Sequence, residues 1–126
     1  MAKMVLIIED DNFLLGLEAK KLKKEGYDIS TAVNSEEAFR LIDSRVKIDL
    51  ILLALMLPDV DGFTILEKVR KNGSKEIADV PVIIFSNLSE EKDIERAKSL
   101  GISEFMVKSN FTLDELAAKV KELIGA

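Results

Sequence analysis

Short apolar runs alternate with amphipathic segments along the whole sequence. Five runs have the length and composition of strands, at residues 4–8, 27–32, 50–54, 82–85 and 105–107. The first, third and fourth are apolar at consecutive positions, which is typical of strands buried on both faces of a sheet. The second alternates partly between polar and apolar residues, as expected of a strand at the edge of a sheet.

The segments between the runs have the apolar spacing of amphipathic helices. Leu15, Ala19 and Leu22 follow an i, i+4, i+7 pattern, and similar patterns occur at residues 38–42 and 65–69. The clearest apolar stripe belongs to the last segment and consists of Leu113, Leu116, Ala117, Val120, Leu123 and Ile124. These patterns predict one helix after each strand.

Helix boundaries support these predictions. The sequence Thr-Leu-Asp-Glu at residues 112–115 is typical of a capping box at a helix start, and Asn-Ser-Glu-Glu at residues 34–37 can act similarly. Glycines at 26, 73, 101 and 125 each follow a helical segment. A residue with a left-handed conformation is favoured at these positions, and glycine adopts it without strain.

The order of elements predicts the fold class. Strands that alternate with helices through short connections favour right-handed crossovers and a parallel sheet covered on both faces. We therefore expect an α/β fold with a five-stranded, doubly wound parallel sheet and five helices. The chain has 126 residues, which favours one domain spanning residues 1–126. Ligands of such folds bind beyond the carboxyl ends of the strands.

Composition and charge exclude several classes of function. The 18 basic and 23 acidic residues give a net charge of −5, which offers no electrostatic reason to expect nucleic-acid binding. The absence of cysteine and histidine excludes disulfides, zinc–thiolate sites and histidine-based catalysis. The longest apolar run, residues 50–57, is far shorter than the ~20 residues that span a bilayer. With no signal peptide in the sequence, we expect a cytoplasmic protein.

Chemically active side chains follow the strands at the edge where ligands are expected. Glu9, Asp10 and Asp11 follow the first strand, Ser86 follows the fourth and Lys108 follows the fifth. Adjacent carboxylates repel one another unless a cation joins them, and Mg²⁺ is suitable because it takes oxygen ligands and keeps several waters. Taken singly, each residue also has an ordinary interpretation: a solvated acidic loop that caps a helix, a turn serine and a lysine that reaches solvent.

The ordered set resembles a receiver domain of two-component response regulators, a flavodoxin-like fold. The resemblance covers Lys3 to Ile124 and includes Leu-Pro-Asp-Val-Asp-Gly at residues 57–62 and Phe-x-x-Lys at residues 105–108. It implies a Mg²⁺-dependent phosphorylation switch. A histidine kinase or phosphotransfer protein would supply the phosphoryl group, and a downstream effector or output domain would receive the signal. The resemblance implies a monomer or a weak homodimer.

Roles are carried over from the family by position. Glu9 and Asp10 resemble the metal-binding acidic pair, with Asp10 the better candidate for direct contact, and the backbone carbonyl of Met56 resembles the third protein ligand. The position of the phosphate-accepting aspartate holds Ala54. A methyl group cannot accept a phosphoryl group, and the loss of an oxygen ligand is expected to weaken Mg²⁺ binding.

Residues that resemble the family's switch residues and its lysine are also present. Ser86 and Phe105 resemble the hydroxyl and aromatic residues that propagate the signal, and Lys108 resembles the lysine that contacts the phosphoryl group. Phe105 has no hydroxyl, so any switching must rely on packing, and a simple core role is its alternative. Receivers usually have proline after the lysine, whereas this chain has Ser109. Because a cis bond before a non-proline residue costs about 2.5–4 kcal/mol, we predict a trans peptide.

Two explanations of Ala54 are open. The chain is either an engineered, phosphorylation-dead variant of an ordinary receiver or a natural pseudo-receiver that acts as a phosphate-independent binding module. The otherwise complete set of site residues favours the first. A Mg²⁺-dependent phosphohydrolase is a third hypothesis, with Asp10 as its remaining nucleophile. The short chain shows no cap or substrate pocket, so we expect a signalling domain rather than an enzyme.

Overall fold

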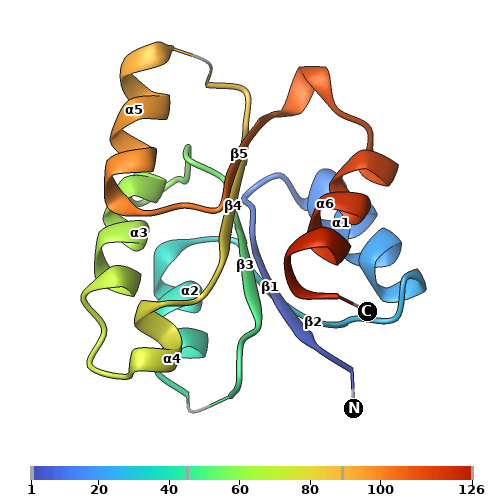
Figure 1. Ribbon diagram of the computed structural model, residues 1–126, viewed down its shortest axis with the longest axis horizontal. Helices are drawn as coiled ribbons and strands as arrows, with labels where there is room; N and C mark the ends of the chain where they lie inside the picture. Colours follow the sequence, from blue (N-terminus) through green and yellow to red (C-terminus); the bar gives the residue numbers. More distant parts are fainter. Residues whose placement is uncertain (1, 45, 89, 126) are drawn as a thin grey trace.

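A computed structural model describes residues 2–44, 46–88 and 90–125 of the chain. Five parallel strands form one sheet in the order β2-β1-β3-β4-β5 (Figure 1). The strands are β1 (Met4–Ile8), β2 (Asp28–Ala32), β3 (Leu50–Leu53), β4 (Val82–Ser86) and β5 (Glu104–Val107). The predicted doubly wound parallel sheet is confirmed, and β2 lies at an edge as its partial alternation indicates.

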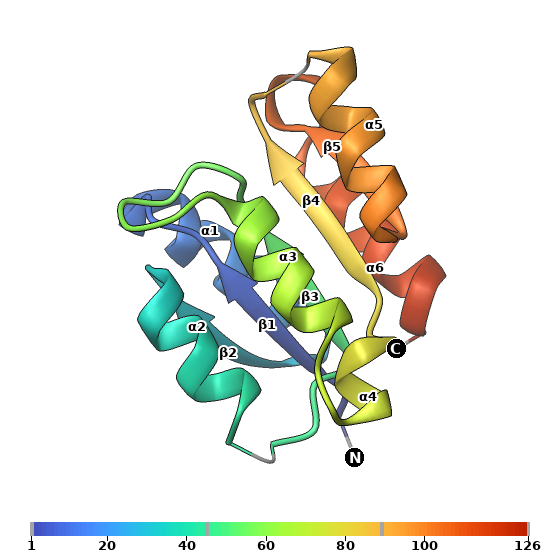
Figure 2. The same cartoon turned by 90° about the vertical axis from the view of Figure 1, so that its left-hand side faces the viewer.

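Helices cover both faces of the sheet (Figures 1 and 2). One face carries α1 (Asn12–Lys24) and α6 (Leu113–Ile124), and the other carries α2 (Ser35–Ile42), α3 (Gly62–Arg70) and α5 (Glu91–Leu100). These are the five helices that the sequence predicts. The structure adds a short helix, α4 (Lys75–Ala78), and a 3₁₀ turn, η1 (Lys108–Asn110). Elements of three or four residues are too short to show a hydrophobic period, which explains why they were not predicted.

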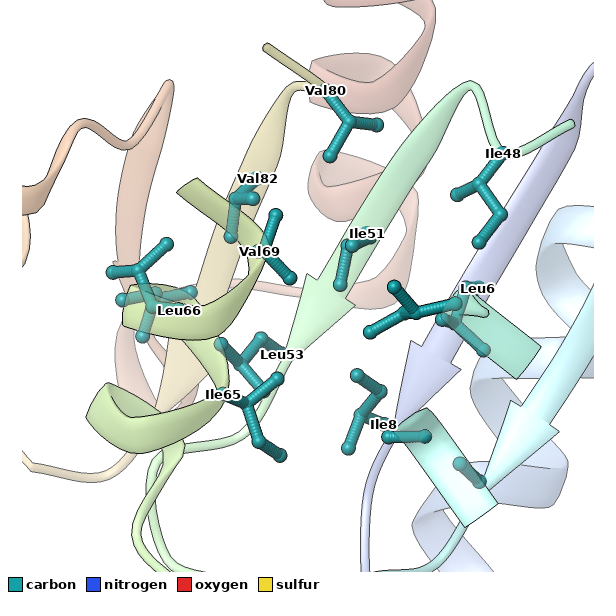
Figure 3. Packing of buried hydrophobic residues seen from close by; sticks show 14 of the residues in the cluster. Leu6, Ile8, Ile48, Ile51, Leu53, Ile65, Leu66, Val69, Val80 and Val82 are labelled. Atoms are coloured by element: carbon teal, nitrogen blue, oxygen red, sulfur yellow. The ribbon is translucent and has the colours of Figure 1, made fainter. Parts of the chain in front are cut away.

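The core consists of two apolar layers, one on each side of the sheet. Leu6 and Ile8 of β1 belong to the layer beneath α2, α3 and α5 (Figure 3), whereas Val5 and Ile7 belong to the layer beneath α1 and α6. Successive side chains of a strand point to opposite faces, so a strand covered on both sides is apolar at every position. This arrangement confirms the interpretation of the unbroken apolar runs.

The register of the sheet aligns the carboxyl ends of its central strands. Ile8 of β1 pairs with Leu53 of β3, Leu53 pairs with Ile84 of β4, and Ser86 pairs with Val107 of β5. The residues that follow these strands therefore leave the sheet at one edge, which we call the carboxyl end. The opposite edge, which includes α4, is the amino end (Figure 1).

The predicted helix boundaries are largely correct. The Thr112 side chain accepts a hydrogen bond from the Glu115 N–H at 3.1 Å, and the Glu115 carboxylate accepts one from the Thr112 N–H at 2.9 Å, so the capping box is confirmed. The glycines after α1, α5 and α6 have positive φ angles. Gly73 does not, because α3 ends at Arg70 and the chain has already left the helix. Within the described ranges, no helix combines the length and the hydropathy that a membrane crossing requires.

Candidate functional site

A buried ion pair lies at the carboxyl end of the sheet. The ammonium of Lys108 is 2.5 Å from Oε1 of Glu9, and Glu9 is only 2% exposed. Burial raises the pKa of the Glu9 carboxyl, Lys108 opposes this increase, and the neighbouring Asp10 adds to it. Lys108 begins η1 and reaches back across the sheet from β5, the strand at the far edge. The Lys108–Ser109 peptide is trans, as predicted.

The acids that follow Glu9 have different environments. Asp10 is exposed, and its carboxyl contributes to the raised pKa of Glu9. Asp11 is the N-cap of α1, where its Oδ1 accepts hydrogen bonds from the N–H groups of Phe13 and Leu14 at 3.0 and 3.1 Å. Asp11 therefore caps α1, which is the role that the structural interpretation of the acidic loop predicts. Glu9 and Asp10 are left as two adjacent oxygen donors.

The loop between β3 and α3 brings residues 54–61 to the same end of the sheet. Ala54 directly follows β3, is buried, and donates its N–H to the Ile8 carbonyl at 3.0 Å. Met56 lies two residues further, with its side chain 66% exposed. Among residues 2–44, 46–88 and 90–125, no three side chains of the metal-binding types gather into one group. A metal here would therefore rely on two carboxylates and a backbone oxygen.

Gly62 fixes the path of this loop into α3. Its N–H donates to the Leu55 carbonyl at 2.6 Å. A Cβ atom at position 62 would lie 2.5 Å from the backbone oxygen of Ala54 and 2.8 Å from the Cα of Leu55. Asp61 then caps α3 by accepting a hydrogen bond from the Thr64 N–H at 3.0 Å. The close approach requires glycine, which explains its place in the sequence motif.

The predicted switch residues lie on β4 and β5. Ser86 ends β4 and is buried, and its hydroxyl accepts a hydrogen bond from the Leu88 N–H at 3.2 Å. This bond is typical of a serine that stabilises a turn, which is the alternative interpretation of Ser86. Phe105 is half-buried and packs against the layer beneath α2, α3 and α5. The structure thus places both residues where the sequence predicts, and Phe105 has the packing that its core alternative requires.

One buried acid near the site was not singled out from the sequence. Glu18 of α1 is 1% exposed, and its Oε1 is the one buried side-chain oxygen or nitrogen of the described residues without a hydrogen-bond partner. Burial raises its pKa to about 8, the charge of Glu9 adds to this effect, and Lys108 opposes it. Glu18 lies three residues after Leu15 and four before Leu22, on the apolar stripe. Its position on this stripe is the signal in the sequence that indicates a buried acid.

Sequence comparison identifies relatives across nearly the whole chain. The family model described as response regulator receiver domain matches residues 5–121. The transcriptional regulatory protein KdpE of Staphylococcus aureus is 36% identical over 121 residues, which cover 96% of this chain and 49% of that protein. The chain spans about half the length of the curated relatives that it matches.

Solved structures share the fold. A two-component response regulator from Clostridium difficile has a TM-score of 0.86 and 30% identity, covering 96% of this chain and 94% of that one. The receiver domain of a sensor histidine kinase from Pseudomonas aeruginosa has a TM-score of 0.85 and 23% identity, with both chains covered completely. In that structure a magnesium ion is coordinated in the active site cleft.

Proposed function

The chain belongs to the response regulator receiver domain family, and we propose that its carboxyl end is a phosphorylation site in which Ala54 replaces the phosphate-accepting residue. The observation that carries this proposal is the convergence of Glu9, Lys108 and the loop after β3 at the end of the sheet. Residues 1–126 would form one receiver domain. In this form the domain would be unable to accept a phosphoryl group, because alanine has no nucleophilic oxygen.

The donor set at this end fits a Mg²⁺ ion. The carboxylates of Glu9 and Asp10 and the carbonyl of Met56 are all oxygen donors, which Mg²⁺ prefers. The effect of Asp10 on Glu9 supports a cation there, since Asp10 makes ionisation of Glu9 harder. When bound, the ion would neutralise the charge of phosphoryl oxygens. Ala54 removes one further oxygen, so we expect weaker binding than in a form with aspartate.

The remaining residues would act on the phosphoryl group and on the signal. Lys108, which pairs with Glu9 in the structure, would neutralise a phosphoryl oxygen as a point charge once Glu9 binds the metal. Ser86 would exchange its turn hydrogen bond for one to the phosphoryl group. Phe105, which packs against the core and lacks a hydroxyl, would respond through packing alone.

The surface around the site supports a protein partner. Phe13 is 78% exposed, and Met56 and Phe111 are exposed apolar side chains in the segments that flank the site. A histidine kinase or phosphotransfer protein must bring its phosphohistidine to position 54, so it would cover these side chains. The relatives are about twice as long, and KdpE is named as a transcriptional regulator, which supports a downstream effector or output domain. The expected cytoplasmic location is part of the same proposal.

Restoring the acceptor tests the proposal directly. The chain and its Ala54→Asp variant would be incubated with Mg²⁺ and acetyl phosphate, and the intact mass of each would be measured. Ala54→Asn is the matched control, because it has the size of aspartate without its nucleophilic carboxylate. We expect only Ala54→Asp to gain a phosphoryl group, and chelation of Mg²⁺ to prevent it. No gain in Ala54→Asp would favour the second candidate, a phosphate-independent binding module, which the methyl group of Ala54 already suggests.

A further inference from the structure

Asp59, in the loop after β3, binds the first turn of α2. Both oxygens of its carboxylate accept hydrogen bonds from the Ser35 N–H at 3.1 Å, and Oδ2 accepts a third from the Ser35 hydroxyl at 2.5 Å. The carboxylate also accepts a hydrogen bond from the Val60 N–H at 3.0 Å. Ser35 is buried, so its polar groups depend on this partner. The contact joins residues that lie 24 positions apart.

The contact lies next to the end of β1. In the sheet, β2 and β3 flank β1, so the loops that follow β2 and β3 flank the residues that follow β1. Backbone pairing continues to this end, since the Glu9 N–H donates to Ala32 at 2.9 Å and the Ala54 N–H donates to Ile8 at 3.0 Å. Figure 2 shows the loop after β3 extending toward the beginning of α2. The Asp59–Ser35 contact thus joins the two loops beside Glu9.

The N-cap residue of α2 is Asn34 and not Asp59. The Asn34 side chain already accepts a hydrogen bond from the Glu37 N–H at 2.9 Å, and the Glu37 carboxylate accepts one from the Val33 N–H at 3.1 Å. These local bonds form the N-cap of α2, and the N–H of Ser35, its first residue, is left to Asp59. Asp59 adds a tertiary contact, because it joins the loop after β3 to the start of α2.

The loop itself has three fixed points. Met56 and Asp61 form an isolated antiparallel bridge, and Gly62 is packed against the backbone of Ala54. Asp59 is the third point, and it lies between Met56 and Asp61 in the sequence. Hydrogen bonds from Ser35 lower the pKa of Asp59, so the carboxylate remains an acceptor over a wide pH range.

We propose that Asp59 is a positioning residue for the metal site, which holds the loop so that the Met56 carbonyl faces the cation bound by Glu9 and Asp10. The inference rests on the proposed function of the same site. Groups that orient a metal ligand without touching the metal typically change its affinity by roughly 10- to 100-fold. Loss of the Asp59 carboxylate should therefore weaken Mg²⁺ binding even though Asp59 is not itself a ligand.

The test measures Mg²⁺ affinity by calorimetry in the Ala54→Asp form, together with the melting temperature. Asp59→Ala and Asn34→Ala form a matched pair, because each removes a side-chain acceptor from the first turn of α2. We expect both to lower the melting temperature and only Asp59→Ala to weaken Mg²⁺ binding, by about tenfold. Asp59→Asn, which keeps one acceptor oxygen, should recover part of the affinity.

The outcomes separate this inference from the proposed function. Mg²⁺ affinity unchanged in Asp59→Ala would overturn the positioning role, as would an equal loss in Asn34→Ala, which would indicate a general effect of a weaker α2. If the Ala54→Asp parent itself binds no Mg²⁺, the proposed function is wrong and the positioning role is overturned with it.

Discussion

The two ends of the sheet differ in the polar groups that they bury. At the carboxyl end, Glu9 and Ser86 are buried between strand ends, and Lys108 reaches Glu9. The amino end contains a cavity of about 370 Å³ lined by the end of α2, the segment before β3 and α4, but none of the buried polar residues lines it. Buried charge, rather than hollow space, therefore distinguishes the end of the sheet to which we assign the proposed site.

Polar contacts at the amino end have a structural role. The guanidinium of Arg70 donates to the carbonyls of Gly101, Ala78 and Val80 at 2.7, 3.0 and 2.7 Å, which ties α3 to the segments around α4 and β5. Every one of these bonds joins a charged donor to a backbone acceptor. At the carboxyl end, the charged side chains of Glu9 and Lys108 instead form a buried ion pair. Desolvation offsets much of the attraction in such a pair, so it is weak evidence for a purely structural role and is expected where a ligand completes the set.

The largest effect on stability is expected from the ionisation of Glu18. Its pKa is raised from the ordinary value of 4.5 to about 8 in the folded state, so the folded chain holds this proton more tightly than the unfolded chain. As pH rises from 4.5 to 8, the unfolded state ionises first, and the free energy of unfolding falls by roughly 3–5 kcal/mol. Glu18→Gln should remove this decline. Urea unfolding at pH 5 and pH 8 measures it.

A surface glutamate provides the control for Glu18. Glu91 is exposed in the first turn of α5, and Glu91→Gln should keep the pH dependence of the parent chain. If Glu18→Gln and Glu91→Gln have the same pH dependence, the buried acid does not carry the effect, and the contrast between the two ends loses its energetic basis.

A smaller loss of stability is expected at one of two glycines that lie at opposite ends of the sheet. Gly62→Ala places a Cβ against backbone atoms that cannot move aside, and overpacking of this kind destabilises by about 1–3 kcal/mol. Gly73 lies at the amino end in open space, so Gly73→Ala should change stability by at most about 0.5 kcal/mol. Chemical unfolding of both variants measures the difference. Similar losses in the two variants would contradict the close approach at Gly62.

The smallest expected loss of stability concerns the N-terminal caps of two helices. Thr112 begins α6 at the carboxyl end with both bonds of a capping box, whereas Ser74 begins α4 at the amino end without a side-chain cap bond. Thr112→Ala should therefore destabilise by about 1 kcal/mol, and Ser74→Ala by a few tenths at most. Thermal unfolding of both variants at one pH measures the two losses, and a larger loss in Ser74→Ala would contradict the capping role of Thr112.

Local patterns predicted most of the fold. The apolar runs located all five strands, the partial alternation at residues 27–32 placed β2 at an edge, and Thr112 and Glu115 marked the start of α6. These features depend on neighbours in the sequence, which is why they can be recognised there. The residues at the strand ends were placed correctly for the same reason, since a parallel sheet brings successive carboxyl ends together.

The site details that were missed depend on contacts between distant segments. Nothing in the local sequence pairs Asp59 with Ser35 or brings Lys108 across the sheet to Glu9. Glu18 is different, because its position on the stripe between Leu15 and Leu22 marked it as buried. Its raised pKa, however, arises from burial and from the charge of the nearby Glu9, which only the folded chain brings about.

The most direct test of the account is a Mg²⁺ titration of the Ala54→Asp variant followed by amide NMR shifts. We expect the shifts to concentrate at residues 9–11, 54–58 and 107–109, at the carboxyl end, while residues 46–49 and 72–77 around the amino-end cavity remain unchanged. Shifts that concentrate at the amino end, or no saturable shifts anywhere, would contradict the claim that the buried charges mark a metal-dependent site.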